Sequence, residues 1–179
     1  MVALAFAPMT RAIASAPPGW AAQRLALRPA VTSDMPFLRR LYAQTRAVEL
    51  AGVPWPAAMR EQFLDDQFAL QHRHYTQQFG SAEFLIVEAE GEPIGRLYLD
   101  HASDACHVID ISIEQAWQGK GLGTALLGQV QHDAGSASRA VTLNVNRHNP
   151  RARRLYEALG FVTVADEGVY TSMRWPAPS

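Results

Sequence analysis

Hydrophobic residues recur with two different periods along the chain, and the changes of period predict the order of its elements. Alternating polar and apolar positions predict β-strands, which we place at 24–29, 83–88, 93–100, 107–113, 142–145, 161–165 and 169–175. Apolar residues at helical spacing predict helices, which we place at 35–50, 57–79, from 122 onward and at 149–159. The order β-α-α-β-β-β-α-β-α-β-β predicts a mixed α+β layer.

Capping and turn residues support these boundaries. Thr32-Ser33-Asp34 supplies N-cap candidates for the first helix, and Gly52-Val53-Pro54-Trp55-Pro56 breaks the chain before the second. The last helix has Pro150 at its first position and Gly160 beyond its end. We find no linker inside 24–175, so this stretch is predicted to be a single domain.

The first 23 residues follow neither period. They are rich in Ala and Pro, so we expect a disordered or poorly ordered leader at 1–23, the domain at 24–175 and a tail at 176–179. Ala14-Ser15-Ala16 resembles a signal-peptidase site, but no positive charge precedes the apolar start, and Pro8 and Arg11 interrupt it. Met9 could equally initiate the chain, so it stays open whether the leader belongs to the mature protein.

Composition narrows the classes of function. The 179 residues carry a net charge of −1 and are 18% charged, which argues against a nucleic-acid or anionic-membrane partner. No run approaches the ~20 apolar residues of a membrane span. A single cysteine, Cys106, excludes internal disulfides and fits a cytoplasmic protein; we interpret it as a packing residue. His72 and His74 do not share a helix face, so we expect no metal site and regard both as solvated.

A glycine-rich stretch follows the strand at 107–113. Gln118-Gly119-Lys120-Gly121-Leu122-Gly123 leads directly into a predicted helix. The first N–H groups of a helix lack internal partners and attract anions, and glycine lets a backbone approach such an anion closely. A tight connection without a ligand is the alternative. The run lacks the pattern of a P-loop or of a dinucleotide-binding fingerprint.

Two blocks resemble the GNAT superfamily of N-acetyltransferases. The first is the acyl-CoA signature Gln/Arg-x-x-Gly-x-Gly/Ala, met by Gln118, Gly121 and Gly123. The second is a strand ending in Asn146, followed by a helix with Leu-Tyr-Glu-Ala-Leu-Gly-Phe at 155–161. The resemblance is strong from about Glu83 to Phe161. It implies a central, mostly antiparallel twisted sheet of about seven strands flanked by about four helices, splayed between the strands at 107–113 and 141–145.

The resemblance also implies an activity and a cofactor. Members move an acetyl group from acetyl-CoA to a primary amine by direct attack in a ternary complex, and a non-catalytic acyl-CoA sensor of the same fold is the alternative. The cofactor would contact the central strand, the glycine run and the strand-to-helix turn: Ile111, Ser112, Ile113, Gln118, Gly119, Lys120, Gly121, Leu122, Gly123, Thr124, Asn146, Asn149 and Arg151. A backbone N–H near Ile111 is the expected oxyanion donor. For Asn149, a plain helix N-cap is the competing interpretation.

Tyr156 occupies the family's position for the general acid. A phenol with a pKa near 10 is protonated at neutral pH and can donate a proton to the departing CoA thiolate. The alternative is a tyrosine that packs under Phe161.

The general base is less defined by the sequence. Asp110 is an acid inside an otherwise apolar strand, so it is either paired and structural or open to the acceptor cleft. Alternation places Val108, Asp110 and Ser112 on one face, opposite His107 and the isoleucines at 109, 111 and 113. Glu83 and His107 are reserve candidates.

The first two predicted helices and their connection would form the acceptor wall, as the resemblance implies. The candidate residues there are Trp55, Phe63, Gln67 and Gln71. Aromatic and amide groups with few charges favour a small or moderately polar amine, but the acceptor itself, which could be a small molecule or a protein amine, is not readable. The sequence also leaves open whether the protein is a monomer or a homodimer.

Overall fold

The computed structural model describes residues 4–6, 14–101 and 104–176, and it confirms the α+β prediction. A seven-stranded sheet has the order β1-β2-β3-β4-β5-β7-β6. Its strands are β1 (Leu25–Pro29), β2 (Glu83–Ala89), β3 (Glu92–Asp100), β4 (Ala105–Ile113), β5 (Ala140–Asn146), β6 (Val162–Glu167) and β7 (Tyr170–Trp175). The α-helices are α1 (Met35–Leu50), α2 (Ala57–Gln78), α3 (Leu122–Ser136) and α4 (Pro150–Ala158). Among these helices, none combines the length and the apolar run that crossing a membrane requires.

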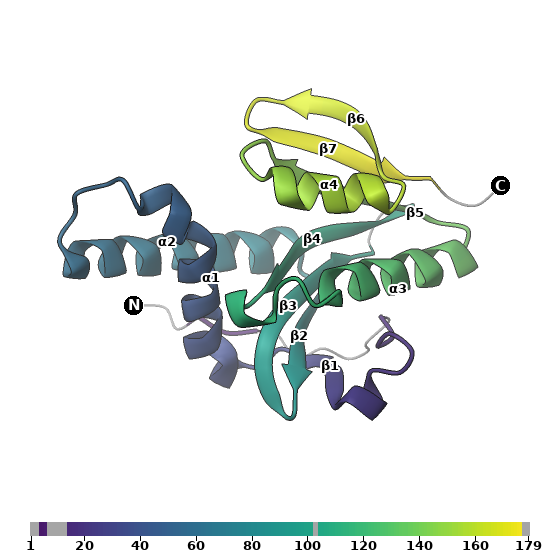
Figure 1. Ribbon diagram of the computed structural model, residues 1–179, viewed down its shortest axis with the longest axis horizontal. Helices are drawn as coiled ribbons and strands as arrows, with labels where there is room; N and C mark the ends of the chain where they lie inside the picture. The colour runs from purple at the N-terminus through teal and green to yellow at the C-terminus, as the bar shows by residue number, and fades with distance from the viewer. Residues whose placement is uncertain (1–3, 7–13, 102–103, 177–179) are drawn as a thin grey trace.

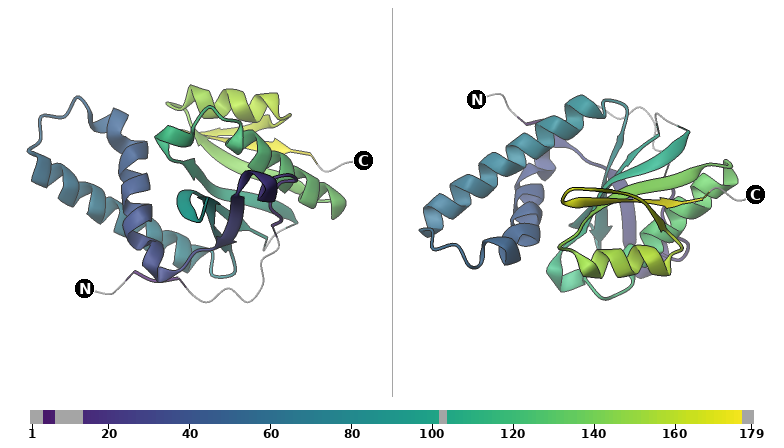
Figure 2. Two further views of the ribbon diagram at one scale, coloured as in Figure 1. Left: turned by 60° about the horizontal axis from the view of Figure 1, so that its bottom comes forward. Right: turned by 90° about the horizontal axis from the view of Figure 1, so that it is seen from above.

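Helices cover both faces of the sheet. Leu38 of α1 and Phe68 of α2 belong to one buried cluster with Ile86 of β2. Leu126 of α3 belongs to a second cluster with Leu97 of β3. Seen from above, the strands lie between the α1–α2 pair and the side of α3 and α4 (Figures 1 and 2).

The sheet splays open between β4 and β5, as expected. These two strands pair in parallel only from Ala105 and Ala140 to Val108 and Leu143, whereas the other neighbouring strands are antiparallel. Beyond Val108, β4 continues to Ile113 in register with β3 alone. The part built from β5, β7, β6 and α4 lies above the part built from β1 to β4 in Figure 1.

A bulge in β4 overturns the predicted faces of this strand. Tyr98 of β3 pairs with Asp110, but the next residue, Leu99, pairs with Val108, so Ile109 is an extra residue in β4. An inserted residue reverses the alternation beyond it. Consequently Val108 lies in the same cluster as the isoleucines at 111 and 113, on the α3 face, while Asp110 is turned toward α2.

The leader is not separate from the domain over its described part. Trp20 is 3% exposed and belongs to the cluster on the α3 face. The backbone N–H groups of Ala14 and Ser15 donate to the carboxylates of Glu83 (3.0 Å) and Asp133 (3.1 Å). The boundary at 23/24 stays a prediction, and the burial of Trp20 favours a packed unit that begins before it. Residues 1–3, 7–13 and 177–179 lie outside the described residues.

His72 also differs from its prediction as a solvated residue. It is buried, and its Nε2 lies 3.0 Å from the carbonyl oxygen of Ala5. Phe6 contacts the His72 ring edge-on, with centroids 4.8 Å apart. The N-terminal stretch at 4–6 thus covers this position, a contact distant in sequence that local pattern does not reveal.

Candidate functional site

A groove of about 470 Å³ opens where α3 begins, within the range typical of small-ligand sites. It runs from the splayed end of β4 past the start of α3 to α4. Ten of the thirteen predicted cofactor residues line it: Ile111, Ile113, Gln118, Gly119, Gly121, Leu122, Gly123, Thr124, Asn149 and Arg151. The structure thus brings together two blocks that are separated by about thirty residues of chain.

The start of α3 has the geometry that an anion site requires. Gly119 and Gly121 have φ of +77° and +80°, and nothing lies within 4 Å of where a Cβ of Gly121 would stand. Gly121 is the N-cap and offers no side-chain hydrogen bond to the helix. The first N–H groups of α3 are therefore left for an external acceptor, which suits a phosphate group of the cofactor.

Gln118 and Arg151 join the two sides of the groove. Arg151 Nη1 donates to Gln118 Oε1 at 3.0 Å, and Gln118 Nε2 donates to the carbonyl oxygen of Ile113 at 2.9 Å. This carbonyl lies on the edge of β4 that has lost its β5 partner. The side chain of Gln118 thus hydrogen-bonds to a backbone carbonyl on a free strand edge. An extended ligand could pair with the same edge in its place.

Three predicted cofactor residues do not line the groove. Ser112 Oγ donates to Asp110 Oδ1 at 2.8 Å, because the bulge turns it toward the α2 face. The exposed ammonium of Lys120 lies 4.3 Å from the Trp117 ring centroid. Asn146 accepts a hydrogen bond from the backbone of His148. Asn149 lines the groove and also caps α4, since its Oδ1 accepts from Ala152 N at 3.0 Å.

Sequence reasoning missed several groove residues. Trp117, Ala152 and Leu155 line it. Trp117 directly precedes the glycine run, and this position in the sequence could have identified it as a groove residue. Ala152 and Leu155 follow from helical spacing only once the groove side of α4 is known.

Tyr156 reaches the groove from α4. It is 8% exposed, lines the groove, and lies 5.9 Å from Phe161 between ring centroids, so it both packs on Phe161 and faces the ligand site. Its hydroxyl makes no hydrogen bond to another described residue. Burial, and then the negative charge of Asp110, raise the pKa of Tyr156 to about 12. The phenol therefore holds its proton throughout the physiological range.

Asp110 is the centre of a buried polar network. Its oxygens accept from Arg96 Nε at 3.0 Å and Nη2 at 2.8 Å, and from the hydroxyls of Ser112 at 2.8 Å and Tyr75 at 3.3 Å. The Arg96 side chain is 3% exposed, and its Nη2 also donates to Gln71. This pairing favours the structural alternative for Asp110. Arg96, a lone charge in an apolar strand, was the missed signal.

The reserve bases lie away from the groove. Glu83 is 2% exposed, faces Ala14 and His101, and stands at the other end of the sheet from Ile113. His107 Nδ1 lies 3.0 Å from Thr142 Oγ1 where β4 and β5 still pair, and its ring stacks on Phe79. Burial lowers the pKa of His107.

The predicted acceptor wall divides into two parts. Gln71 belongs to the Asp110 network through its bond to Arg96. Trp55 and Phe63 pair edge-on, with ring centroids 5.0 Å apart, at the outer end of the α1–α2 connection. Gln67 is half-buried and lies on α2 between Phe63 and Gln71. With a rise of about 1.5 Å per residue, Phe63 lies roughly 12 Å along α2 from Gln71. Only the part around Gln71 therefore adjoins β4.

The chain is similar in sequence to known proteins. A family model described as "Acetyltransferase (GNAT) family" matches residues 38–161. A mycothiol acetyltransferase of Nocardiopsis dassonvillei is 34% identical over 90 residues, which are 50% of this chain and 24% of that protein. The chain thus spans about a quarter of the length of this curated relative.

Solved structures share the fold. The PaiA N-acetyltransferase of Thermoplasma acidophilum in complex with coenzyme A has a TM-score of 0.67 at 16% identity, covering 85% of this chain and 98% of that one. YncA of Salmonella typhimurium, a putative acetyltransferase with its cofactor acetyl-CoA, has a TM-score of 0.56 at 20% identity, covering 87% and 95%.

Proposed function

Because the chain belongs to the GNAT family of acetyltransferases, we propose that it moves an acetyl group from acetyl-CoA directly to the primary amine of an acceptor in a ternary complex. One observation carries the proposal: Tyr156, with its protonated phenol, lines the same groove as the open start of α3. The groove therefore combines a helix start suited to an anion with a proton donor. Acyl transfer from acetyl-CoA needs both, because the cofactor carries phosphate groups and its thiolate must leave.

The start of α3 would hold the pyrophosphate of the cofactor. The N–H groups that follow Gly121 are free of internal partners, and the helix dipole adds a partial positive charge. Acetyl-CoA supplies the activated acetyl group. The unpaired edge of β4 at Ile111 and Ile113 lines the groove, so we expect the pantetheine arm to lie along it and a backbone N–H near Ile111 to stabilise the oxyanion.

Tyr156 would supply the proton for the departing thiolate. The pKa of the phenol, about 12, lies above that of a thiol near 8.5, so proton transfer before the C–S bond weakens is unfavourable. The phenol instead donates a hydrogen bond that strengthens as negative charge grows on sulfur. The role of Asp110 as base stays a prediction, and its ion pair with Arg96 favours a positioning role for the α2 wall.

The experiment that tests the function is a screen of primary amines with acetyl-CoA, read as release of free CoA thiol. We expect small or moderately polar amines to be accepted, because the wall around Gln71 presents amide and phenol groups. Wild-type protein without amine, and Tyr156→Phe with amine, serve as controls. Tight CoA binding without amine-dependent thiol release would contradict turnover and leave a binding module.

A further inference from the structure

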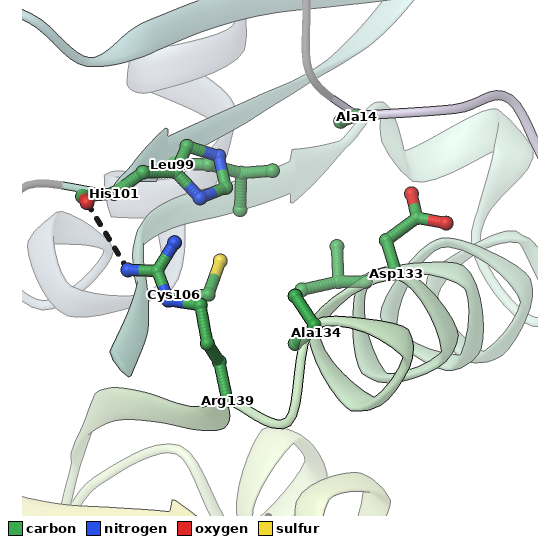
Figure 3. Close-up of a pocket in the computed structure, with 9 residues that line it drawn as sticks. Ala14, Leu99, His101, Cys106, Asp133, Ala134 and Arg139 are labelled. Carbon is green, nitrogen blue, oxygen red and sulfur yellow. Dashed lines mark hydrogen bonds between the residues drawn. The ribbon is translucent and has the colours of Figure 1, made fainter. Parts of the chain in front are cut away.

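A second, smaller cavity, of about 70 Å³, lies on the α3 side of the sheet near the start of β4. Two charged groups on its wall already bond within the protein. Arg139 Nη2 donates to the carbonyl oxygens of His101 and Ala105, both at 3.0 Å, and Asp133 Oδ2 accepts from Ser15 N at 3.1 Å. Figure 3 shows the bond between Arg139 and His101 at the cavity wall. This cavity therefore offers an external ligand less than the unpaired edge of β4 does.

The hydroxyl of Tyr75 lies beside that unpaired edge, on the face of the sheet that α2 covers. Tyr75 belongs to α2, and its hydroxyl donates to Asp110 Oδ2 at 3.3 Å. Asp110 stands on β4 beyond Val108, the last residue of this strand that pairs with β5. The next residue, Ile111, lines the cofactor groove. The phenol of Tyr75 and the groove therefore lie on opposite sides of one short stretch of strand.

Aromatic contacts hold the Tyr75 ring in place. Its centroid lies 6.2 Å from that of Tyr98 and 6.4 Å from that of Phe79, both in edge-on geometry. The residue is nevertheless only half-buried. A side chain that is already ordered and still accessible can orient a ligand at a small cost in conformational entropy.

The phenol of Tyr75 has only the lone pairs of its oxygen to offer a ligand. A carboxylate accepts hydrogen bonds and donates none, so the proton of the hydroxyl points toward Asp110. Burial, and then the negative charge of Asp110, raise the pKa of Tyr75, so the phenol keeps this proton. The remaining lone pairs suit an N–H donor, and an amine is such a donor.

Asp110 itself has little capacity left for an amine. Its two oxygens accept four hydrogen bonds, from Arg96 Nε and Nη2 and from the hydroxyls of Ser112 and Tyr75, and a carboxylate has about four such positions. The guanidinium of Arg96 also neutralises its charge. An ammonium group therefore gains little from Asp110, and a proton moves onto this carboxylate only if one of the four donors is displaced.

We propose that Tyr75 determines acceptor specificity: its phenol oxygen accepts an N–H from an amine that enters as the free base. This role depends on the proposed acetyl transfer. The hydrogen bond would direct the nitrogen lone pair toward the thioester carbonyl beside Ile111. The nitrogen forms the new C–N bond, the C–S bond breaks, and the surplus proton on nitrogen goes to water. The thiolate takes its proton from Tyr156, which recovers one from water.

Entry as the free base selects acceptors of low basicity. An α-amine next to a carbonyl has a pKa near 8, whereas an alkyl amine such as that of lysine has a pKa near 10.4. At pH 7.5 about a quarter of the first but only about 0.1% of the second is unprotonated. The acceptor class that fits is therefore a primary α-amine rather than an alkyl amine or a polyamine.

The test measures acetyl transfer by the full chain at pH 7.5 to glycinamide, an α-amine, and to n-butylamine. We expect kcat/KM for glycinamide to be higher on the order of tenfold or more, because the greater nucleophilicity of the alkyl amine offsets only part of its smaller free-base fraction. Equal values for the two amines would show that a base in the site removes the proton, and would overturn the proposal.

Tyr75→Phe separates recognition of the amine from a structural role. The loss of one neutral hydrogen bond should raise KM for glycinamide about fivefold, with kcat and KM for acetyl-CoA within about twofold. Tyr98→Phe is the matched control, because the buried Tyr98 hydroxyl finds no hydrogen-bond partner among the described residues. It should keep all three constants. An unchanged KM for glycinamide in a folded Tyr75→Phe protein would contradict the role, and if this variant does not fold, the comparison of the two amines in wild type decides.

A binding measurement distinguishes failure of this role from failure of the acetyl transfer. If no amine releases thiol, glycinamide is titrated by NMR into protein saturated with CoA. Binding that weakens about fivefold in Tyr75→Phe but not in Tyr98→Phe would support the Tyr75 site without turnover. No binding to wild type, or equal binding to wild type and Tyr75→Phe, would overturn it.

Discussion

Two side chains from different elements influence each other electrostatically near the splay between β4 and β5. Tyr156 comes from α4 and Asp110 from β4, and the negative charge of Asp110 contributes to the raised pKa of Tyr156. Their surroundings nevertheless differ. The phenol faces the groove, whereas the carboxylate is tied to Arg96, Ser112 and Tyr75. Residue-level experiments can therefore separate proton donation from support of the wall.

Replacing Tyr156 with Phe tests proton donation. The ring keeps its packing on Phe161 but loses the hydroxyl, so kcat should fall on the order of 10²-fold while CoA affinity stays constant. Tyr42→Phe is a matched control, because Tyr42 is buried in the other cluster. Steady-state kinetics and calorimetry measure both quantities. An unchanged kcat with chemistry rate-limiting would return Tyr156 to a packing role.

The pH dependence of kcat follows from the same phenol. Its pKa is raised to about 12, so the proton-bearing form persists as the pH rises, and the loss of this acid begins only as the pH approaches 12. We expect no Tyr156-dependent fall of kcat between pH 7 and roughly 10. A pH–rate profile with saturating amine measures this. A descending limb near pH 9 that disappears in Tyr156→Phe would contradict it.

Asp110→Asn tests the polar network. Removing one charge of a buried pair leaves the Arg96 guanidinium uncompensated, which should lower the free energy of unfolding by about 3 kcal/mol. We expect activity per folded molecule to be largely kept. Urea denaturation beside a pH–rate profile measures both. Preserved stability with a kcat/KM that falls at neutral pH and recovers at high pH would instead identify Asp110 as the base.

At the scale of elements, the bulge in β4 and the start of α3 decide what the groove presents. The extra residue Ile109 turns Ile111 toward the groove and Asp110 toward α2. Without this extra residue, alternation would place Asp110 on the groove side of β4 and Ile111 on the α2 side. The glycine turn then places the open helix start beside that strand end. The ligand site is thus a product of two local irregularities, one in a strand and one in a turn.

Gly121→Glu tests the helix start. It adds a carboxylate at the expected position of the pyrophosphate and a Cβ at φ +80°, so CoA binding should fall at least 100-fold. Gly91→Glu is the matched control, because Gly91 has φ +85° and open space around it, in the β2–β3 turn. Backbone strain is then similar in both proteins. Calorimetry that finds equal CoA affinity in the two folded variants would contradict the anion site.

At the scale of the whole molecule, the N-terminal segment completes the α3 face. Trp20 is buried among residues of the sheet, and Ala14 and Ser15 tie the chain to Glu83 and Asp133. The described part of this segment therefore packs against the sheet and α3. The packed unit begins before β1.

Trp20→Ala tests this boundary. A tryptophan that is 3% exposed leaves a cavity when it is truncated, so the free energy of unfolding should fall by about 3 kcal/mol or more. Trp55→Ala is the control, because Trp55 packs against an exposed Phe63 at the outer end of α2 and should cost less. Urea denaturation compares the two. Equal stability of Trp20→Ala and wild type would favour the boundary at 23/24.

Local sequence determined the elements and the outline of the site. Periodicity gave α1 at its observed bounds, Met35–Leu50, and the remaining elements within a few residues, because burial of one face imposes a period of 3.6 or 2. The glycine run predicted the open start of α3, since its signal lies in adjacent residues. The fold class followed from the order of the elements and is confirmed.

Tertiary structure alone decided the rest. The bulge at Ile109, the ion pair of Asp110 with Arg96, the burial of Trp20 and His72, and the contact of His101 with Glu83 all depend on contacts between distant segments. A sequence period reports which face of an element is buried, but it does not report which partner lies there. Polar residues in particular acquire their role from that partner, because burial without one is costly.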